Sequence, residues 1–393
     1  MELTIIISIC TLLLIAYLFD ISSSRTKIPS VILLLLLGWF VRELTNFFSF
    51  QLPDFSSVLP ILGTIGLILI VLEGSLELEL NQSKFKLIRK SFLGAFIPII
   101  AMAFTVAYLF QYYGGYSLKN SLVNAIPFCV ISSAVAIPSV RNLGTSNKEF
   151  IIYESSLSDI FGVIFFNFIA LNEIFDSATF GRFGLQLLIM IIVSFIATIG
   201  LSLMLSKINH HIKFVPIILL VILIYAIAKT YHLPALIFIM LFGLFIGNLD
   251  ELKHFKWIEK FRPDELDKEV KKFKELINEG AFLIRALFFL LFGYLIETDE
   301  ILNPETIIWA VGIVSIIFTF RTIQLLLSGF PLMPLLFVAP RGLITILLFL
   351  SIAPTQNISL VSKSLVIQVI ILSALIMMIG IMISKTKKET VPQ

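Results

Sequence analysis

Charged residues are scarce in this sequence. They make up 14% of the chain, against roughly 25% in soluble globular proteins. Hydrophobic residues account for 58% of it. A water-soluble fold could not cover so much leucine, isoleucine and phenylalanine with polar side chains. The composition therefore excludes a soluble globular protein and indicates a fold that is solvated by lipid.

Dense basic charge and clustered cysteines are also missing. The net charge is +3 and the lysines and arginines are scattered, without the basic patch that nucleic-acid binding needs. Cys10 and Cys129 lie in apolar runs and indicate neither a disulfide nor a redox compartment. No cofactor site is predicted. The N-terminus lacks the basic region and the cleavage site of a signal peptide, so we expect the first apolar run to remain as a membrane helix.

What the sequence has in abundance is apolar runs of membrane-spanning length. A helix needs about 20 residues to cross the hydrocarbon layer. Because the runs are apolar on every face and do not alternate, we predict thirteen helices. They lie at about 3–19, 28–45, 57–77, 91–112, 120–140, 150–172, 184–206, 214–230, 233–249, 279–296, 305–327, 333–353 and 361–383.

Lysine and arginine are unevenly distributed over the segments between these runs. With the N-terminus placed outside, 21 of the 29 fall on the cytoplasmic side, 5 fall on the opposite side, and three lie inside runs. Cytoplasmic loops of membrane proteins carry such an excess. The bias predicts a multi-pass protein of the inner (plasma) membrane with its N-terminus out and its C-terminus in.

The longest loop, 250–278, carries mixed charges and is expected to be a solvated amphipathic linker, largely helical. It is too short for a soluble domain. We therefore expect an all-α protein with a single transmembrane domain over residues 1–390 and no soluble regulatory domain. The domain would comprise a first repeat at 1–172, a linking helix at 184–206 and a second, inverted repeat at 214–384.

Two runs carry proline and small polar residues near their middles. The fifth reads NAIPFCVISSAVAIPSVRNLG, in which Pro127 and Pro138 bracket a short polar segment. The twelfth contains Pro340 and Gly342 in its course. Proline removes a backbone donor and clashes with the preceding helical turn. Each proline could merely kink a buried helix, but breaks at matching ranks in two six-helix repeats are typical of transporters with crossed, discontinuous helices.

Ionisable residues inside the membrane are costly and usually functional or paired. The most informative here is Asp159, about ten residues into the sixth run. Ser155, four residues earlier, shares its helix face, and Ser156 lies nearby. A carboxylate beside hydroxyls can bind a dehydrated monovalent cation or a proton, but not both, so competition becomes exchange. The alternative is a structural aspartate that is hydrogen-bonded by Ser155 and Ser158.

The remaining intramembrane charges are two glutamates and three arginines. Glu154 is the best available partner for Arg285, and we predict a structural ion pair between them because a buried arginine needs a counter-charge. Arg321 has no obvious sequence partner, and Asp159 or the carbonyl ends of broken half-helices could serve it. For Arg341 snorkelling and function are both open. Glu73 could reach the site or lie near the cytoplasmic end of the third run.

These residues also carry a family resemblance. Residues 154–159, ESSLSD, resemble the ES-x-x-N-D signature of cation/proton antiporters of the sodium/proton exchanger type, in the monovalent cation:proton antiporter superfamily. Residues 72–78, LEGSLEL, resemble the F-E-G-x-x-L element of their third span, and residues 339–342, APRG, resemble their P-R-G segment. FFLLFGYLIE resembles their tenth span. The ordered set covers nearly the whole chain.

The resemblance implies a homodimer with a dimerisation domain and a mobile core. It implies a cation held by an aspartate, by the serine four residues before it and by carbonyls of the broken fifth span. It maps the family's glutamate–arginine pair to Glu154 and Arg285, and its basic residue of the eleventh span to Arg321. Carried over, the candidate cation- and proton-binding residues are Asp159, Ser155, Ser158, Ser132, Ser133, Ile131 and Glu73, with Arg321 and Arg341 compensating charge at the helix breaks.

Two departures from the family pattern bear on function. Ser158 stands where the family has asparagine, and Ser132-Ser133-Ala134 stands where many members have Thr-Asp-Pro. With one site carboxylate, we expect electroneutral exchange of one Na⁺, or K⁺, for one proton by an elevator-type movement. The alternatives are a transport-inactive membrane sensor or partner protein, and a sodium-coupled carrier of an organic anion, for which only Arg321 offers a basic pocket.

Overall fold

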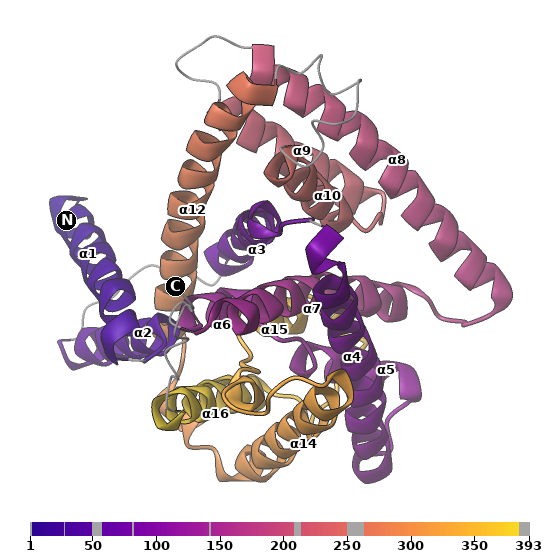
Figure 1. The fold of residues 1–393 in the computed structure, drawn as a ribbon. Helices are drawn as coiled ribbons and strands as arrows, with labels where there is room; N and C mark the ends of the chain where they lie inside the picture. The colour runs from indigo at the N-terminus through magenta and orange to yellow at the C-terminus, as the bar shows by residue number, and fades with distance from the viewer. Residues whose placement is uncertain are drawn as a thin grey trace. The chain divides into compact units, whose positions relative to one another are not determined.

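The computed structural model of the protein describes residues 2–26, 28–48, 57–80, 82–140, 143–207, 214–249 and 263–384. Within these ranges the chain is helical and forms no β-strand, as predicted (Figure 1). The chain divides into two compact units. The first comprises Met1–Thr64, Lys90–Phe166 and Leu283–Gln393, and the second comprises Ile65–Arg89 and Asn167–Phe282.

Each of the thirteen apolar runs coincides with one helix or with one broken helix. The unbroken helices are α1 (Glu2–Thr26), α2 (Ser30–Phe47), α3 (Val58–Glu77), α4 (Phe85–Gly114), α7 (Thr145–Leu171), α8 (Ser177–Lys207), α9 (Phe214–Thr230), α10 (Leu236–Gly247), α12 (Pro263–Tyr294), α14 (Pro304–Ser328) and α16 (Lys363–Ile383), with short turns at η1 (Gln82–Lys84) and α13 (Thr298–Ile301). Among the described residues, 9 helices are long and apolar enough to cross a membrane. The number of spans and the sidedness of the termini stay predictions.

Both expected breaks are present. The fifth run folds as α5 (Leu118–Ala125) and η2 (Ile126–Phe128), followed by an irregular segment, 129–132, and by α6 (Ser133–Ser139). The twelfth folds as η4 (Leu335–Phe337), an irregular segment, 338–342, and α15 (Leu343–Leu350). Pro127 is the middle residue of the 3₁₀ turn in the first break, whereas Pro138 is accommodated inside α6. The backbone is therefore irregular at corresponding places in the two broken helices.

The loop expected at 250–278 is helical over its second part. Residues 250–262 lie outside the described residues, but α12 already begins at Pro263, sixteen residues before the predicted span. Val270, Phe273, Ile277 and Ala281 recur at helical spacing on α12 and are all buried. Within the second unit, the Phe273 ring lies 6.0 Å from the ring of Phe214. This stretch is therefore an amphipathic helix with one buried face, and it is not a fully solvated linker.

Small residues let helices approach closely in both units. In the second unit, a Cβ added to Gly247 of α10 would lie 2.8 Å from the Leu76 carbonyl oxygen of α3. In the first unit, a Cβ added to Gly38 of α2 would lie 2.2 Å from the Leu290 carbonyl oxygen of α12, and one added to Gly293 would lie 2.4 Å from the Leu35 carbonyl oxygen. Such backbone contact is typical of helix packing in lipid.

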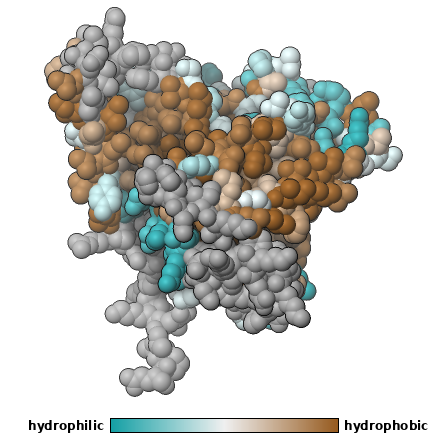
Figure 2. All heavy atoms as spheres, turned by 90° about the horizontal axis from the view of Figure 1, so that it is seen from above, coloured by the Kyte–Doolittle hydropathy of each residue, from teal (hydrophilic) through white to brown (hydrophobic). Residues whose placement is uncertain are grey.

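The surface is apolar where a soluble protein would be polar. Figure 2 shows brown, hydrophobic side chains over much of the drawn face. On α8 the exposed residues include Leu188, Ile192, Phe195 and Ile196. Burying apolar side chains on one face and exposing them on the other is the pattern that lipid solvation predicts.

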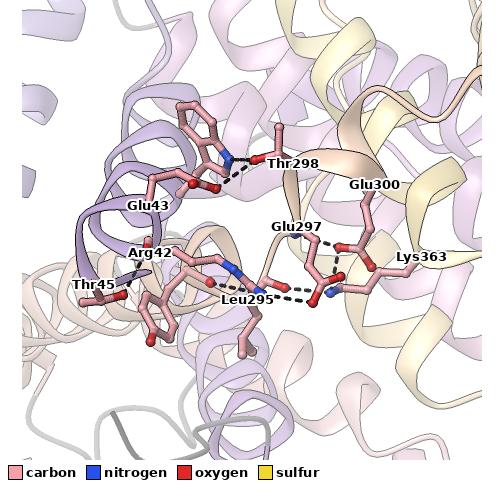
Figure 3. A network of polar contacts seen from close by, with 10 residues as sticks. Arg42, Glu43, Thr45, Leu295, Glu297, Thr298, Glu300 and Lys363 are labelled. Atoms are coloured by element: carbon pink, nitrogen blue, oxygen red, sulfur yellow. Dashed lines mark hydrogen bonds and ion pairs between the residues drawn. The ribbon is translucent and has the colours of Figure 1, made fainter. Parts of the chain in front are cut away.

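A polar network joins four elements of the first unit (Figure 3). Arg42 of α2 pairs with Glu297, which follows α12, at 2.9 Å between Nη2 and Oε1. Lys363, the first residue of α16, pairs with Glu300 of α13 at 2.9 Å and donates to the Leu295 carbonyl at 2.7 Å. The network therefore links α2 and α16 to the end of α12.

Candidate cation and proton site

The carboxylate of Asp159 lies at the break in the first broken helix. Asp159 is only 1% exposed on α7. Its Oδ2 accepts hydrogen bonds from the backbone N–H of Ser133, at 3.3 Å, and from the Ser133 hydroxyl. Ser133 is the first residue of α6, so the carboxylate meets the chain where the helix resumes. The hydrogen bonds of Asp159 therefore run to Ser133, and not to Ser155 or Ser158 on its own helix.

The two irregular segments meet beside this carboxylate. The Ser132 N–H donates to the Pro340 carbonyl at 3.0 Å, which ties one broken helix to the other. A Cβ added to Gly342 would lie 2.8 Å from the Ser132 hydroxyl oxygen and 2.7 Å from Val135 Cγ2, so glycine permits the close crossing. In Figure 1 this crossing lies among α6, α7 and α15.

α7 is docked on the first irregular segment by Ser158. Its hydroxyl oxygen accepts from the Ile131 N–H at 2.9 Å. One turn further along, a Cβ added to Gly162 would lie 2.2 Å from Val130 Cγ2, so α7 and this segment are in direct contact. Ser158 thus satisfies a backbone donor that the break sets free.

Several buried oxygens of the site have no hydrogen-bond partner within the described part of the chain. They are Asp159 Oδ1, Ser132 Oγ and Ser156 Oγ. Ser155 is fully buried, and its hydroxyl donates to the Ile151 carbonyl at 2.7 Å, one turn back on α7. Its oxygen remains able to accept or to act as a ligand. The cluster therefore offers oxygen atoms, which are the ligands that hard cations prefer.

Arg341 compensates the first helix break from the second. It is 1% exposed, and its Nε donates to the Phe128 carbonyl at 2.5 Å, at the end of η2. Its Nη1 donates to the Ala339 carbonyl at 3.0 Å, and its backbone N–H donates to Ser373 Oγ at 3.0 Å. Snorkelling to the interface is thus not what this side chain does. It stabilises carbonyls that the broken helices leave without a helical donor.

The partner predicted for Glu154 is wrong. Glu154 is fully buried and pairs with Arg321 of α14, at 2.5 Å between Oε1 and Nη1, in place of Arg285 of α12. The Arg321 Nε donates to the Leu335 carbonyl of η4 at 3.1 Å. A buried cation opposite Glu154 could be predicted from the sequence, but two buried arginines on different helices could supply it. Arg285 is also buried, with 6% of its surface exposed.

Gln324 also belongs to this cluster, although it was not among the residues predicted from the sequence. Its Nε2 donates to Glu154 Oε1, and its Oε1 accepts from Arg321 Nη1 at 3.0 Å. A signal existed, because Gln324 is a polar residue three positions after Arg321 in an otherwise apolar stretch. Residues at that spacing face the same way on a helix.

A narrow cavity of about 10 Å³, roughly the room that one water needs, lies within the first unit. Ser158, Ile131, Arg321, Gln324 and Arg341 contribute to its lining. It adjoins both the buried ion pair and the backbone of the break. Glu73 belongs to the second unit, where it is half-buried on α3, and its role at the site stays a prediction.

A family model and solved structures both match this chain over nearly its whole length. A model of the family described as sodium/hydrogen exchanger, transmembrane, matches residues 10–388. A structure of the sodium proton antiporter MjNhaP1 from Methanocaldococcus jannaschii at pH 8 is 17% identical and superposes with a TM-score of 0.68 over 97% of this chain and 96% of that chain. An electron-microscopy structure of the same antiporter is 18% identical, with a TM-score of 0.66 and coverage of 97% and 95%. No curated protein matches. At these identities the structural likeness shows the fold.

Proposed function

Because this chain belongs to the sodium/hydrogen exchanger family, whose members are secondary transporters and not enzymes, we propose that it exchanges a monovalent cation for a proton at Asp159. Na⁺ is favoured and K⁺ is the alternative cargo. The coarser activity, cation/proton antiport, rests on the family. The assignment to Asp159 rests on the geometry of the crossing.

The observation that carries the proposal is that the Asp159 carboxylate is buried without a counter-charge among the described residues. Oδ2 accepts two bonds from Ser133, whereas Oδ1 is buried without a hydrogen-bond partner among the described residues. No arginine or lysine within the described residues pairs with it. An isolated buried carboxylate is strongly disfavoured in lipid, so a mobile positive charge must neutralise it. A proton on Oδ1 and an alkali cation beside it are the two candidates, and they compete.

The number of carboxylates in the crossing sets the stoichiometry that we propose. Glu154 is already neutralised by Arg321, which leaves Asp159 alone to exchange its counter-charge. Ser133 occupies the position where many relatives carry an aspartate. One carboxylate that carries either one cation or one proton exchanges equal charges, so transport is electroneutral.

The family supports the remaining parts of the proposal. A homodimer in the inner membrane, with the N-terminus outside, would hold one domain fixed while a core that carries Asp159 moves past it. The excess of lysine and arginine on one set of loops favours that sidedness. Ser155, Ser132 and the backbone near Ile131 would supply further oxygen ligands to the cation.

An inactive relative that acts as a membrane sensor is the competing function, and the missing second carboxylate is the feature that favours it. Proteoliposomes with an imposed pH gradient separate the two. We expect added Na⁺ to dissipate the gradient, and Asp159→Asn to abolish this response. Asp176→Asn is the matched control, because Asp176 is a capping residue that accepts from the Thr179 N–H at 2.8 Å at the start of α8. Equal activity of the Asp159→Asn variant and wild type would remove Asp159 from the mechanism.

A further inference from the structure

We propose that Gln324 is a positioning residue for the exchange: with Glu154 and Arg321 it forms a buried triad that fixes the rotation of α7 and so directs Asp159 at Ser133. This inference rests on the proposed function, because the role it gives Gln324 is exercised through Asp159. It assigns no contact between Gln324 and the transported ions.

The triad is a closed ring of hydrogen bonds. Gln324 Nε2 donates to Glu154 Oε1, Arg321 Nη1 donates to the same oxygen at 2.5 Å, and Arg321 Nη1 also donates to Gln324 Oε1 at 3.0 Å. The three side chains are at most 6% exposed. A side-chain amide can donate from its nitrogen to the carboxylate and accept on its oxygen from the guanidinium at the same time. Gln324 therefore holds both partners in one relative orientation.

The ring is one of two attachments on a single face of α7. Glu154 and Ser158 are four residues apart, so their side chains point the same way about 6 Å apart along the helix. Glu154 is held by α14, and Ser158 is held by the Ile131 N–H at 2.9 Å. Two attachments on one face prevent the helix from rolling about its axis. Asp159 follows Ser158 directly, about 100° further around the helix, so its direction is set by the same two contacts.

The triad also connects to the second broken helix. The Arg321 Nε donates to the Leu335 carbonyl at 3.1 Å, in the turn that precedes the irregular segment. Gln324, Arg321 and Ser158 all line the cavity described above. A shift of the triad would therefore reach both irregular segments and the carboxylate between them.

Gly94 of α4 leaves room for the amide. A Cβ added there would lie 2.7 Å from Gln324 Nε2 and 3.5 Å from Glu154 Oε1. Gly94→Ala would therefore push the amide away from Glu154 without removing any polar group. It gives a second way to disturb the same hydrogen bond.

The test compares Gln324→Leu and Gly94→Ala with wild type in proteoliposomes, and measures the KM for Na⁺, the maximal rate per folded protein and the pH profile of exchange. Loss of one hydrogen bond to a charged group corresponds to a change of about 10- to 150-fold at most. We expect the KM to rise by that factor in Gln324→Leu and by less in Gly94→Ala, with a displaced pH profile and a maximal rate near that of wild type.

Gln368→Leu is the matched control. Gln368 is also a buried glutamine, 3% exposed on α16, but its amide donates to the Ile301 and Asn303 carbonyls and not to α7. A purely structural contribution would lower yield in both glutamine variants and leave KM unchanged. Wild-type KM and pH profile in both folded test variants, or an equal rise of KM in Gln368→Leu, would overturn the role of Gln324. If Gln324→Leu does not fold, Gly94→Ala decides. Absence of exchange in wild type would instead overturn the proposed function.

Discussion

Replacing Ser133 by aspartate should change the charge that the protein moves in each cycle. The Ser133 hydroxyl is in hydrogen-bond contact with Asp159 Oδ2, so a carboxylate at that position would lie close to the first one. Two unit charges about 4 Å apart repel by roughly 4 kcal/mol at an effective dielectric constant of about 20. The two carboxylates would therefore not both be ionised when no cation is bound. Two protons would occupy them in the proton-carrying state, so the variant would exchange two protons for one cation.

The assay is the steady-state Na⁺ gradient in proteoliposomes under an imposed membrane potential. One net charge per cycle couples to the potential by about 2.3 kcal/mol per 100 mV, which is a change of roughly 50-fold in the gradient at equilibrium. Wild type, for which we propose exchange of one charge for one charge, should not respond to the potential at all. Ser133→Asn is the control, because it resembles aspartate in size without its charge, and it should behave like wild type.

The response of wild type to the potential is the most direct test of one-for-one exchange. A Na⁺ gradient that follows the potential in the unmodified protein would show that a second charge already moves, and would refute one-for-one exchange at a single carboxylate. A Ser133→Asp protein that transports but ignores the potential would show that the added carboxylate does not take part.

Two further predictions concern stability. Glu154→Gln should lower the midpoint of thermal unfolding in detergent, because it leaves Arg321 buried without its carboxylate, at a cost of about 3–5 kcal/mol. An unchanged midpoint together with lost transport would make Glu154 a functional and not a structural residue. In the network of Figure 3, Lys363→Glu should lower the midpoint slightly, because part-exposed pairs contribute about 0.2–1 kcal/mol. The double variant with Lys363→Glu and Glu300→Lys should recover most of the lost stability. A double variant that is no more stable than the single one would show that this pair does not tie α16 to α13.

The helices and their breaks could be predicted because each depends on local composition. A segment that is apolar on every face for about 20 residues has few options other than a membrane helix. Pro127 and Pro340 each remove a backbone donor, so the breaks follow from the residue itself. The early start of α12 was also readable, since Val270, Phe273 and Ile277 repeat at helical spacing. The mixed charges on the other face suggested a solvated linker instead.

The pairing of Glu154 could not be predicted because it depends on which helix faces α7. Hydropathy locates Arg285 and Arg321 inside apolar runs with equal clarity, and nothing in their spacing says which one approaches Glu154. The family resemblance did not resolve this, because the pair that it maps to Glu154 and Arg285 differs from the pair in the structure, which joins Glu154 to Arg321. The contact between Asp159 and Ser133 had the same difficulty: both were candidates, but the bond between them depends on where the broken helix resumes.

The two buried acidic residues of α7, Glu154 and Asp159, differ in their counter-charge, which makes one a fixed part of the fold and suits the other to the proposed exchange. Both are buried, and both need a positive counter-charge. Glu154 has Arg321 as a permanent one, held in place by Gln324 and by the Leu335 carbonyl. Asp159 has neutral donors from Ser133 and, within the described residues, no salt bridge. Neutral donors orient a carboxylate without cancelling its charge. In the exchange that we propose, the cancelling charge at Asp159 arrives from solution and leaves again, which a resident arginine at that position would prevent.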